Sequence, residues 1–197
     1  QSVPSSTFQH HFSVQMESQC WHLKWSQFDR WVKSYSERTV IDRTRLLVLL
    51  FAVQMEQPAD PKDASFDEFM TWGSILLNDY DEIDRYLLSS EEVFKNLADI
   101  KEIESWSFNS EELTPAQQRF MEFWDRLPGY YRRLNEILKQ EGVCYMGLAY
   151  RSLAENIDKL FQKDSKRIYL FAGFNALSKA ELSIMKQLHV MGCGHIL

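Results

Sequence analysis

Residues 168–197 read IYLFAGFNALSKAELSIMKQLHVMGCGHIL, and this stretch decides the fold class that the sequence predicts. It opens with Ile168–Phe171, an apolar run that is too short for a helix and is typical of a buried strand. Ser178 and Glu181 then have the spacing of a capping box at the start of a helix. Two glycines end that helix, and the last residues begin a second strand. The stretch therefore predicts a strand–helix–strand (βαβ) unit, which we expect to be a piece of a larger α/β protein because it has no sheet to complete.

Most of the remaining chain follows the three- and four-residue apolar period of helices that pack against a core. Seven Gly and five Pro in 197 residues are few, which disfavours turn-rich all-β folds. Thr39 with Asp42 has the form of a capping box, Thr114 with Pro115 is a strong start signal, and Pro128 predicts a kink or break. The period predicts helices at 27–36, 40–56, 66–87, 93–103, 115–141 and 146–160, after an arm or edge strand at 1–16.

The segment at residues 57–63, QPADPKD, contains two prolines and almost no apolar residues, so it is a linker and the best internal boundary. We therefore expect an N-terminal arm and helices at 1–60, a helical subdomain at 61–165 and the βαβ piece at 166–197. The expected fold class is mainly α, with a small α/β fragment at the C-terminus.

The charge is unevenly distributed along the chain. The whole carries 22 basic and 28 acidic residues, which gives a net charge of −6. Residues 66–112 hold thirteen acidic and three basic residues, a local balance of −10, whereas residues 166–197 carry a balance of +3. Because nucleic-acid affinity depends largely on cations that neutralise phosphates, we expect any contact with a polyanion outside the acidic stretch.

Cysteine usage and hydropathy predict a reducing, cytoplasmic compartment. The three cysteines at positions 20, 144 and 193 cannot all pair, and their spacing is not that of a metal site. The longest strongly apolar run, Leu46–Val53, has eight residues, against about twenty needed to span a bilayer. The sequence therefore predicts no transmembrane helix, and no secretory signal opens the chain.

Several polar clusters could carry chemistry. A divalent cation could bind four carboxylates in the acidic stretch, Asp79, Asp81, Glu82 and Asp84. On a helix these do not share one face, and no Gly-bearing calcium loop accompanies them, so we expect solvated or helix-capping roles. Zinc is disfavoured because His189, Cys193 and His195 lack a partner pair of ligands. Cys144 is expected to be a small buried residue rather than a nucleophile.

Nucleotide binding would need a phosphate loop such as GxxxxGK[ST] or GxGxxG, and neither occurs in the sequence. The basic residues that could contact DNA phosphates are Arg132, Arg133, Lys139, Lys166 and Arg167. Tyr130 and Tyr131 could supply stacking planes for a single strand. Solvated helix faces of any function carry residues of these types, so this pattern alone does not establish DNA binding.

Four stretches carry a resemblance to a known family. Ile168–Glu181 resembles the Walker B strand and following helix of UvrD-type superfamily I helicases, and more closely the degenerate form in AddB-like subunits. Three further stretches are similar to a bacterial group of PD-(D/E)XK nuclease-family proteins with an AddB-like helicase region. They are Phe69–Leu87, Gln118–Trp124 and Glu141–Arg151. The resemblance spans about residues 40–197. It implies a large protein that processes DNA ends in double-strand-break repair, with a helicase-like part and a C-terminal nuclease. In such a protein this chain would be the helical insertion of the first RecA-like domain, and the βαβ unit would re-enter its sheet.

The same resemblance implies that this chain is not catalytic. In active helicases an Asp-Glu pair follows the strand, where the Asp helps to hold Mg²⁺ and the Glu orients the attacking water. Aligned on the helix cap, those places fall at Ala172 and Gly173, which can neither bind a metal nor move a proton. The nuclease motif Asp…Glu-x-Lys would lie downstream. No cofactor is expected, and the implied partners are DNA, through the parent protein, and a helicase–nuclease partner subunit.

Two other functions stay open on the sequence. The chain could be a stand-alone helical module for protein–protein interaction, with the acidic stretch 66–112 as its partner surface. A metal-dependent hydrolase that uses the carboxylates of residues 79–84 is the weakest alternative.

Overall fold

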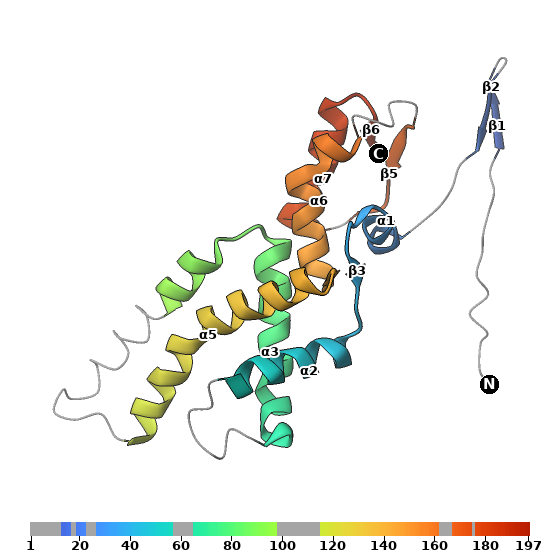
Figure 1. Ribbon diagram of the computed structural model, residues 1–197. Coiled ribbons are helices and arrows are strands. Elements are labelled where there is room, and N and C mark those ends of the chain that lie inside the picture. Colours follow the sequence, from blue (N-terminus) through green and yellow to red (C-terminus); the bar gives the residue numbers. More distant parts are fainter. Residues whose placement is uncertain are drawn as a thin grey trace, which may run out of the picture.

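The structure of the chain is a computed structural model that describes side chains for most of the sequence (Figure 1). For residues 13–16, 19–22 and 115–121 the structure describes the backbone alone. The described residues are 13–16, 19–22, 27–56, 65–97, 115–161, 167–174 and 176–197. The predicted linker at 57–63 and the predicted boundary at 165/166 lie outside them.

The described residues are mainly helical, as predicted, with three small two-stranded sheets. The helices are α1 (Phe28–Tyr35), α2 (Arg43–Glu56), α3 (Phe66–Arg85), a short helix at 90–97, α5 (Pro115–Gln140), α6 (Met146–Phe161) and α7 (Lys179–Val190). The strands are β1 (Ser13–Met16), β2 (Gln19–His22), β3 (Thr39–Val40), β4 (Val143–Cys144), β5 (Tyr169–Phe171) and β6 (Gly194–Ile196). None of the described helices is long and apolar enough to cross a bilayer.

Most helix starts and ends agree closely with the sequence signals. The helix predicted at 93–103 begins earlier, at residue 90, and residues 98–103 lie outside the described residues. The backbone N–H of Arg45 donates to Oδ1 of Asp42 at 3.0 Å, so Asp42 caps α2. The prediction that Thr39 opens this helix is wrong, because Thr39 lies in β3 and pairs there with Val143. α5 begins at Pro115 as predicted, and it continues through Pro128 without a break.

A first core fills the space between α2, α3, the helix at 90–97 and α5. Figure 1 shows α2 lying across α3 and α5. The apolar stripe of α3 faces this core, and Tyr80 is fully buried there. The hydroxyl of Tyr80 donates to the backbone carbonyl of Leu127 at 3.1 Å, which satisfies the buried polar end of its ring.

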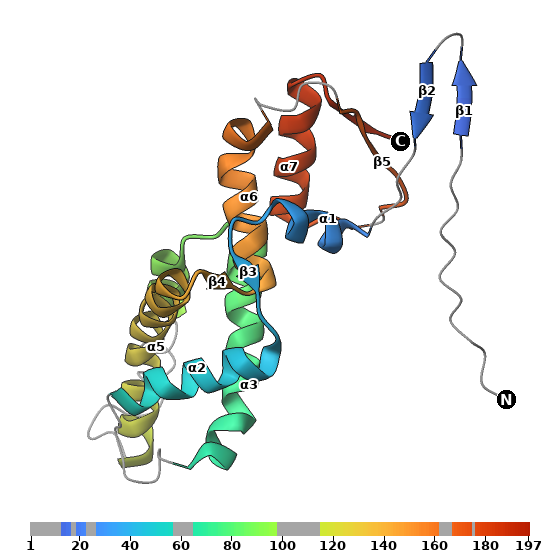
Figure 2. The same cartoon turned by 45° about the vertical axis from the view of Figure 1, so that its right-hand side comes forward.

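A second core lies between α1, α6, α7 and β5. Figure 2 shows α6 and α7 side by side, beyond one end of the α2–α3–α5 group. Aromatic rings from three elements meet here, because Phe28 of α1 lies 5.8 Å from both Tyr150 and Phe171 between ring centroids. The two cores are built from separate sets of buried side chains.

The strand pair β3–β4 lies where the two cores meet, and the sequence did not predict it. The strands run parallel, with Thr39 opposite Val143 and Val40 opposite Cys144. Successive side chains of a strand point to opposite faces. Val143 therefore contributes to the first core, whereas Cys144, buried as predicted, contributes to the second.

The C-terminal βαβ unit forms as predicted. β5 and β6 pair in parallel, with Tyr169 opposite Gly194 and Phe171 opposite Ile196, and α7 is the crossover between them. The capping box at the start of α7 is complete in both directions. α7 packs on α6, and this contact attaches the βαβ unit to the second core.

Candidate functional site

The carboxyl end of β5 is where the resemblance places the missing acid pair. Ala172 and Gly173 directly follow the strand, and both are exposed. Gly173 has a φ of +81°, a left-handed conformation that favours glycine, in the connection between β5 and α7. A methyl group and a hydrogen atom offer neither a ligand oxygen nor a base. The side chains at these two positions therefore cannot hold a cation or activate water.

The N-terminus of α7, which follows this connection, has backbone N–H groups that are hydrogen-bonded by the side chains of Ser178 and Glu181. The N–H of Glu181 donates to Oγ of Ser178 at 3.3 Å, and the N–H of Ser178 donates to Oε2 of Glu181 at 2.7 Å. Helix N-termini that bind phosphates leave such N–H groups free for the anion. Here the Glu181 carboxylate occupies that position, which opposes the binding of a second anion.

One face of the β5–β6 sheet is uncovered by described residues, and on it Leu170 of β5 lies opposite His195 of β6. Tyr169 and Phe171 pack against the second core, so the alternation along β5 turns Leu170 to the opposite face. Leu170 is 51% exposed and Ile168 is 50% exposed. Parallel sheets are normally covered on both faces. The described residues cover only one face of this sheet.

The outer edge of β5 is also unpaired within the described residues. The N–H of Tyr169 donates to the carbonyl of Cys193, and the N–H of Leu197 donates to the carbonyl of Phe171. In a parallel ladder this pattern directs the backbone N–H and C=O groups of Tyr169 and Phe171 toward β6, and those of Leu170 away from it. A further strand could therefore pair with β5 at this edge.

The acidic residues of α3 are divided between solvent and the interior. Asp79 and Glu82 are exposed, as predicted, whereas Asp84 is fully buried. The prediction of a solvated or capping role is wrong for Asp84, because its carboxylate accepts hydrogen bonds from Tyr131, Tyr145 and Arg151. Spacing along one helix could not show that three partners from α5, β4–α6 and α6 would meet this side chain.

Arg151 holds the Asp84 carboxylate in a buried ion pair. The Nε–Oδ1 distance is 2.5 Å, and the Arg151 side chain is only 19% exposed. Its Nη2 also donates to the backbone carbonyls of Ile83, in the last turn of α3, and of Leu88, just beyond that helix. Burial raises the pKa of Asp84, while hydrogen bonds from Tyr145 and Tyr131 and the charge of Arg151 act in the opposite direction. The ion pair and its hydroxyl partners join α3 to α5 and α6.

Asp81 performs a capping role, but for another helix. Its Oδ1 accepts a hydrogen bond from the N–H of Gly147 near the start of α6, and its Oδ2 pairs with Nε of Arg85 at 2.6 Å. The Arg85 guanidinium lies 4.6 Å from the ring centroid of Tyr150, whose hydroxyl donates to Asp29 at 2.6 Å. This connected set of polar contacts joins α3, α6 and α1. Within the part of the chain that the structure describes, no group of three His, Cys, Asp or Glu side chains could hold a metal ion.

The structure places the predicted DNA contacts in different surroundings. Arg132 and Lys139 are exposed on α5, two helical turns apart on about the same face. Arg133 is already engaged, since its guanidinium pairs with Glu56 at 2.8 Å and with Glu136 at 3.3 Å. Lys166 lies outside the described residues.

Arg167 lies elsewhere, beside the second core. Its Nη1 donates to the hydroxyl of Tyr35 at 3.2 Å, and that hydroxyl also bonds the hydroxyl of Tyr169 at 2.6 Å. The predicted stacking rings are not presented to solvent, because Tyr130 is buried and Tyr131 donates to Asp84. The basic residues predicted to contact DNA therefore do not form one surface in the described part of the chain.

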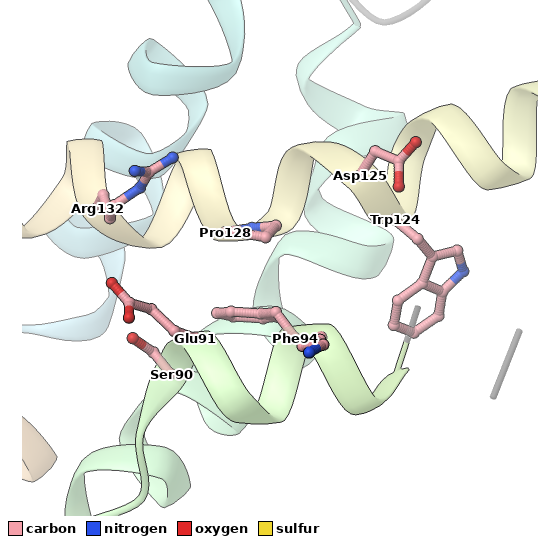
Figure 3. A pocket seen from close by; sticks show the side chains of 8 residues that line it. Ser90, Glu91, Phe94, Trp124, Asp125, Pro128 and Arg132 are labelled. Atoms are coloured by element: carbon pink, nitrogen blue, oxygen red, sulfur yellow. The ribbon is translucent and has the colours of Figure 1, made fainter. Parts of the chain in front are cut away.

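A cavity of about 370 Å³ opens beside Arg132, between the helix at 90–97 and α5. It is lined by Ser90, Glu91, Phe94, Lys95, Trp124, Asp125, Pro128 and Arg132. In Figure 3, Phe94 and Pro128 face each other across its middle, with Glu91 and Arg132 toward one end and Trp124 and Asp125 toward the other. Sequence reasoning assigned Phe94 and Trp124 to the apolar stripes of a core and therefore missed this site. Only the packing of the two helices brings the rings beside the charged residues.

Cys144 and His189 both lie in structural surroundings in the described part of the chain. Cys144 is buried, and burial raises the pKa of its thiol. His189 Nδ1 lies 3.0 Å from the carbonyl of Gly194, which holds the end of α7 against β6.

No protein-family model, curated protein sequence or solved structure matched the chain.

Proposed function

We propose that the chain is a non-catalytic, helicase-derived region of a DNA-processing protein, of the AddB-like kind associated with PD-(D/E)XK nucleases, that holds DNA or docks a partner subunit. The observation that carries the proposal is the parallel β5–α7–β6 crossover, in which Ala172 and Gly173 directly follow β5. Such crossovers belong to larger parallel sheets. The uncovered face and unpaired edge at Leu170 support a sheet that continues beyond these two strands.

The same strand end argues against ATP hydrolysis. A motor of this class needs a carboxylate for Mg²⁺ and a second one to orient water after this strand. Ala172 and Gly173 supply neither, and the Glu181 carboxylate caps the helix N-terminus that follows. We therefore expect the purified chain to show no Mg²⁺-dependent ATP turnover in a phosphate-release assay. Turnover that survives further purification would contradict a non-catalytic role.

The DNA part of the proposal is tested by fluorescence anisotropy with single-stranded and forked DNA. Affinity that rests on phosphate contacts should fall as the salt concentration rises from about 50 to 200 mM. A wild-type chain that binds neither DNA at low salt would leave only the docking role. Docking is then tested by mixing the chain with the candidate nuclease subunit and measuring the complex by size-exclusion chromatography with light scattering.

The docking role predicts that the uncovered sheet face is the contact surface. Leu170→Lys would place a charge in the middle of that face and should abolish the complex. Val190→Lys is the matched control, because Val190 is an 85% exposed residue of α7, outside β5 and β6. Equal loss of binding by both variants, or by neither, would contradict docking through β5.

A helical interaction module with an acidic face is the second candidate. The observation that favours it is that Asp67, Glu68, Asp79 and Glu82 are all exposed on α3. Asp81 and Asp84 are unsuitable for testing this surface, because both hold the fold together. The test therefore replaces Asp79 and Glu82 by Lys and measures binding to a lysine-rich peptide by calorimetry. A basic partner that binds both proteins equally would exclude this face.

A further inference from the structure

We propose that the cavity between the helix at 90–97 and α5 binds one unstacked nucleotide whose base carries an exocyclic amino group, such as cytosine. The proposal deepens the DNA-holding function proposed above and rests on it where the nucleotide belongs to a strand. A volume of about 370 Å³ lies at the small end of the range of about 300–1,000 Å³ found for small-molecule sites. The cavity is therefore large enough for a single small ligand.

The apolar lining suits a planar ring. Phe94, Trp124 and Pro128 contribute flat side chains from two different helices. Phe94 is 8% exposed and belongs to the first core, so Trp124 and Pro128 are the surfaces against which a planar ring could lie. Bases of single strands stack on such aromatic side chains, with about 1–3 kcal/mol of binding free energy for each base.

Four charged side chains surround this lining, two of each sign. Glu91, Lys95, Asp125 and Arg132 are all exposed. Among the described residues, none of the four forms an ion pair or a hydrogen bond with another described side chain. No ion pair between described residues occupies these four side chains, so they are available to a ligand that carries both hydrogen-bond donors and an anion.

A nucleotide with an amino-bearing base has that combination. Glu91 and Asp125 lie toward opposite ends of the cavity, so the carboxylate of one of them can accept a hydrogen bond from the exocyclic amine of cytosine, a pairing by which proteins recognise this base. Arg132 can neutralise the phosphate, and Lys95 can assist it, although Lys95 belongs to the acidic stretch 66–112 outside which the sequence predicted polyanion contacts. Thymine presents a carbonyl where cytosine presents its amine, and it would leave that carboxylate without a donor. The cavity should therefore prefer cytosine to thymine.

The test measures the anisotropy of fluorescein-labelled oligo(dC) and oligo(dT) of about twelve nucleotides, a length within the range of single-strand sites. We expect the wild-type chain to bind oligo(dC) at least about fivefold more tightly. The double variant Glu91→Gln/Asp125→Asn should lose this preference. Glu122→Gln, an exposed acid on α5 that does not line the cavity, should keep it.

The cation is tested separately. Arg132→Ala should weaken binding of both oligonucleotides and lower the slope of log affinity against log salt by about one. Lys139→Ala, an exposed cation two turns along the same helix and outside the cavity, should have a smaller effect. All the substituted side chains are exposed, and circular dichroism would verify that each variant folds.

Calorimetry with free dCMP and dTMP distinguishes the source of the nucleotide. Binding of dCMP without binding of oligonucleotides would retain the cavity as a site for a free nucleotide and refute the DNA-holding function. Equal binding of oligo(dC) and oligo(dT), or a preference that survives the double variant, would refute the cavity and leave DNA binding elsewhere on the chain. No binding of any of these probes would refute both.

Discussion

Replacing Gly147 by alanine places a methyl group against the backbone of α3. A Cβ atom at this position would lie 2.4 Å from the carbonyl oxygen of Asp81 and 2.9 Å from its Cα. Ordinary van der Waals contact begins near 3.4 Å, so α6 would have to move by about 1 Å. That movement would also stretch the hydrogen bond from the Gly147 N–H to the Asp81 carboxylate.

The magnitude follows from three contributions. Overpacking of a close contact costs about 1–3 kcal/mol. Weakening a hydrogen bond to a charged group costs about 1–2 kcal/mol more. The higher helix propensity of alanine offsets about 0.5–1 kcal/mol. We expect Gly147→Ala to lower the free energy of unfolding by about 2–4 kcal/mol, equivalent to a Tm lower by roughly 5–15 °C in a chain of this size.

Thermal and urea unfolding followed by far-UV circular dichroism measure this effect, and Gly129→Ala is the matched control. Gly129 also lies inside a helix, but among the described residues no atom outside its chain neighbours and its own helix backbone lies within 4 Å of the position its Cβ would take. The same substitution should therefore stabilise the protein there by about 0.5–1 kcal/mol. A Gly147→Ala protein as stable as the wild type would refute the close approach of α6 to Asp81.

Three further predictions concern single side chains. Asp84→Ala should destabilise the protein by about 3–5 kcal/mol in urea unfolding, because it leaves a buried guanidinium without its partner; Asp79→Ala, at an exposed position of the same helix, should change stability by less than about 0.5 kcal/mol. Ser178→Ala should cost about 1 kcal/mol through loss of the α7 cap, and an unchanged urea midpoint would exclude that cap. Because burial raises the pKa of the Cys144 thiol, a smaller fraction is thiolate at pH 8, and mass spectrometry of iodoacetamide-treated protein should find Cys144 alkylated more slowly than the less buried Cys193.

The βαβ ending shows how far local signals reach in this protein. The capping box of Ser178 and Glu181, and an apolar run too short for a helix, are properties of neighbouring residues. They predicted α7 and β5 correctly. The parallel pairing of β5 with β6 also followed, because a helical crossover between two strands of one sheet requires it. The family resemblance itself stays a prediction.

Two features near α3 and β3 were decided by contacts between distant residues. Thr39 had the spacing of a cap, but pairing with Val143 drew it into β3 and left the cap of α2 to Asp42. Asp84 looked like one more solvated acid of a charged helix. In the folded chain Tyr131, Tyr145 and Arg151 donate hydrogen bonds to its carboxylate, and these bonds offset the cost of burying it.

By itself, the sequence determined where most of the helices begin and end, which of their faces are apolar, and that no acidic pair follows β5, because these depend on residues a few positions apart. Only the tertiary structure decided which carboxylates are buried, where the two cores meet at β3–β4, and that Phe94, Trp124 and Arg132 line one cavity. Those outcomes depend on how helices pack. A helix pattern specifies that a face must be covered, but not which residues from elsewhere in the chain will cover it.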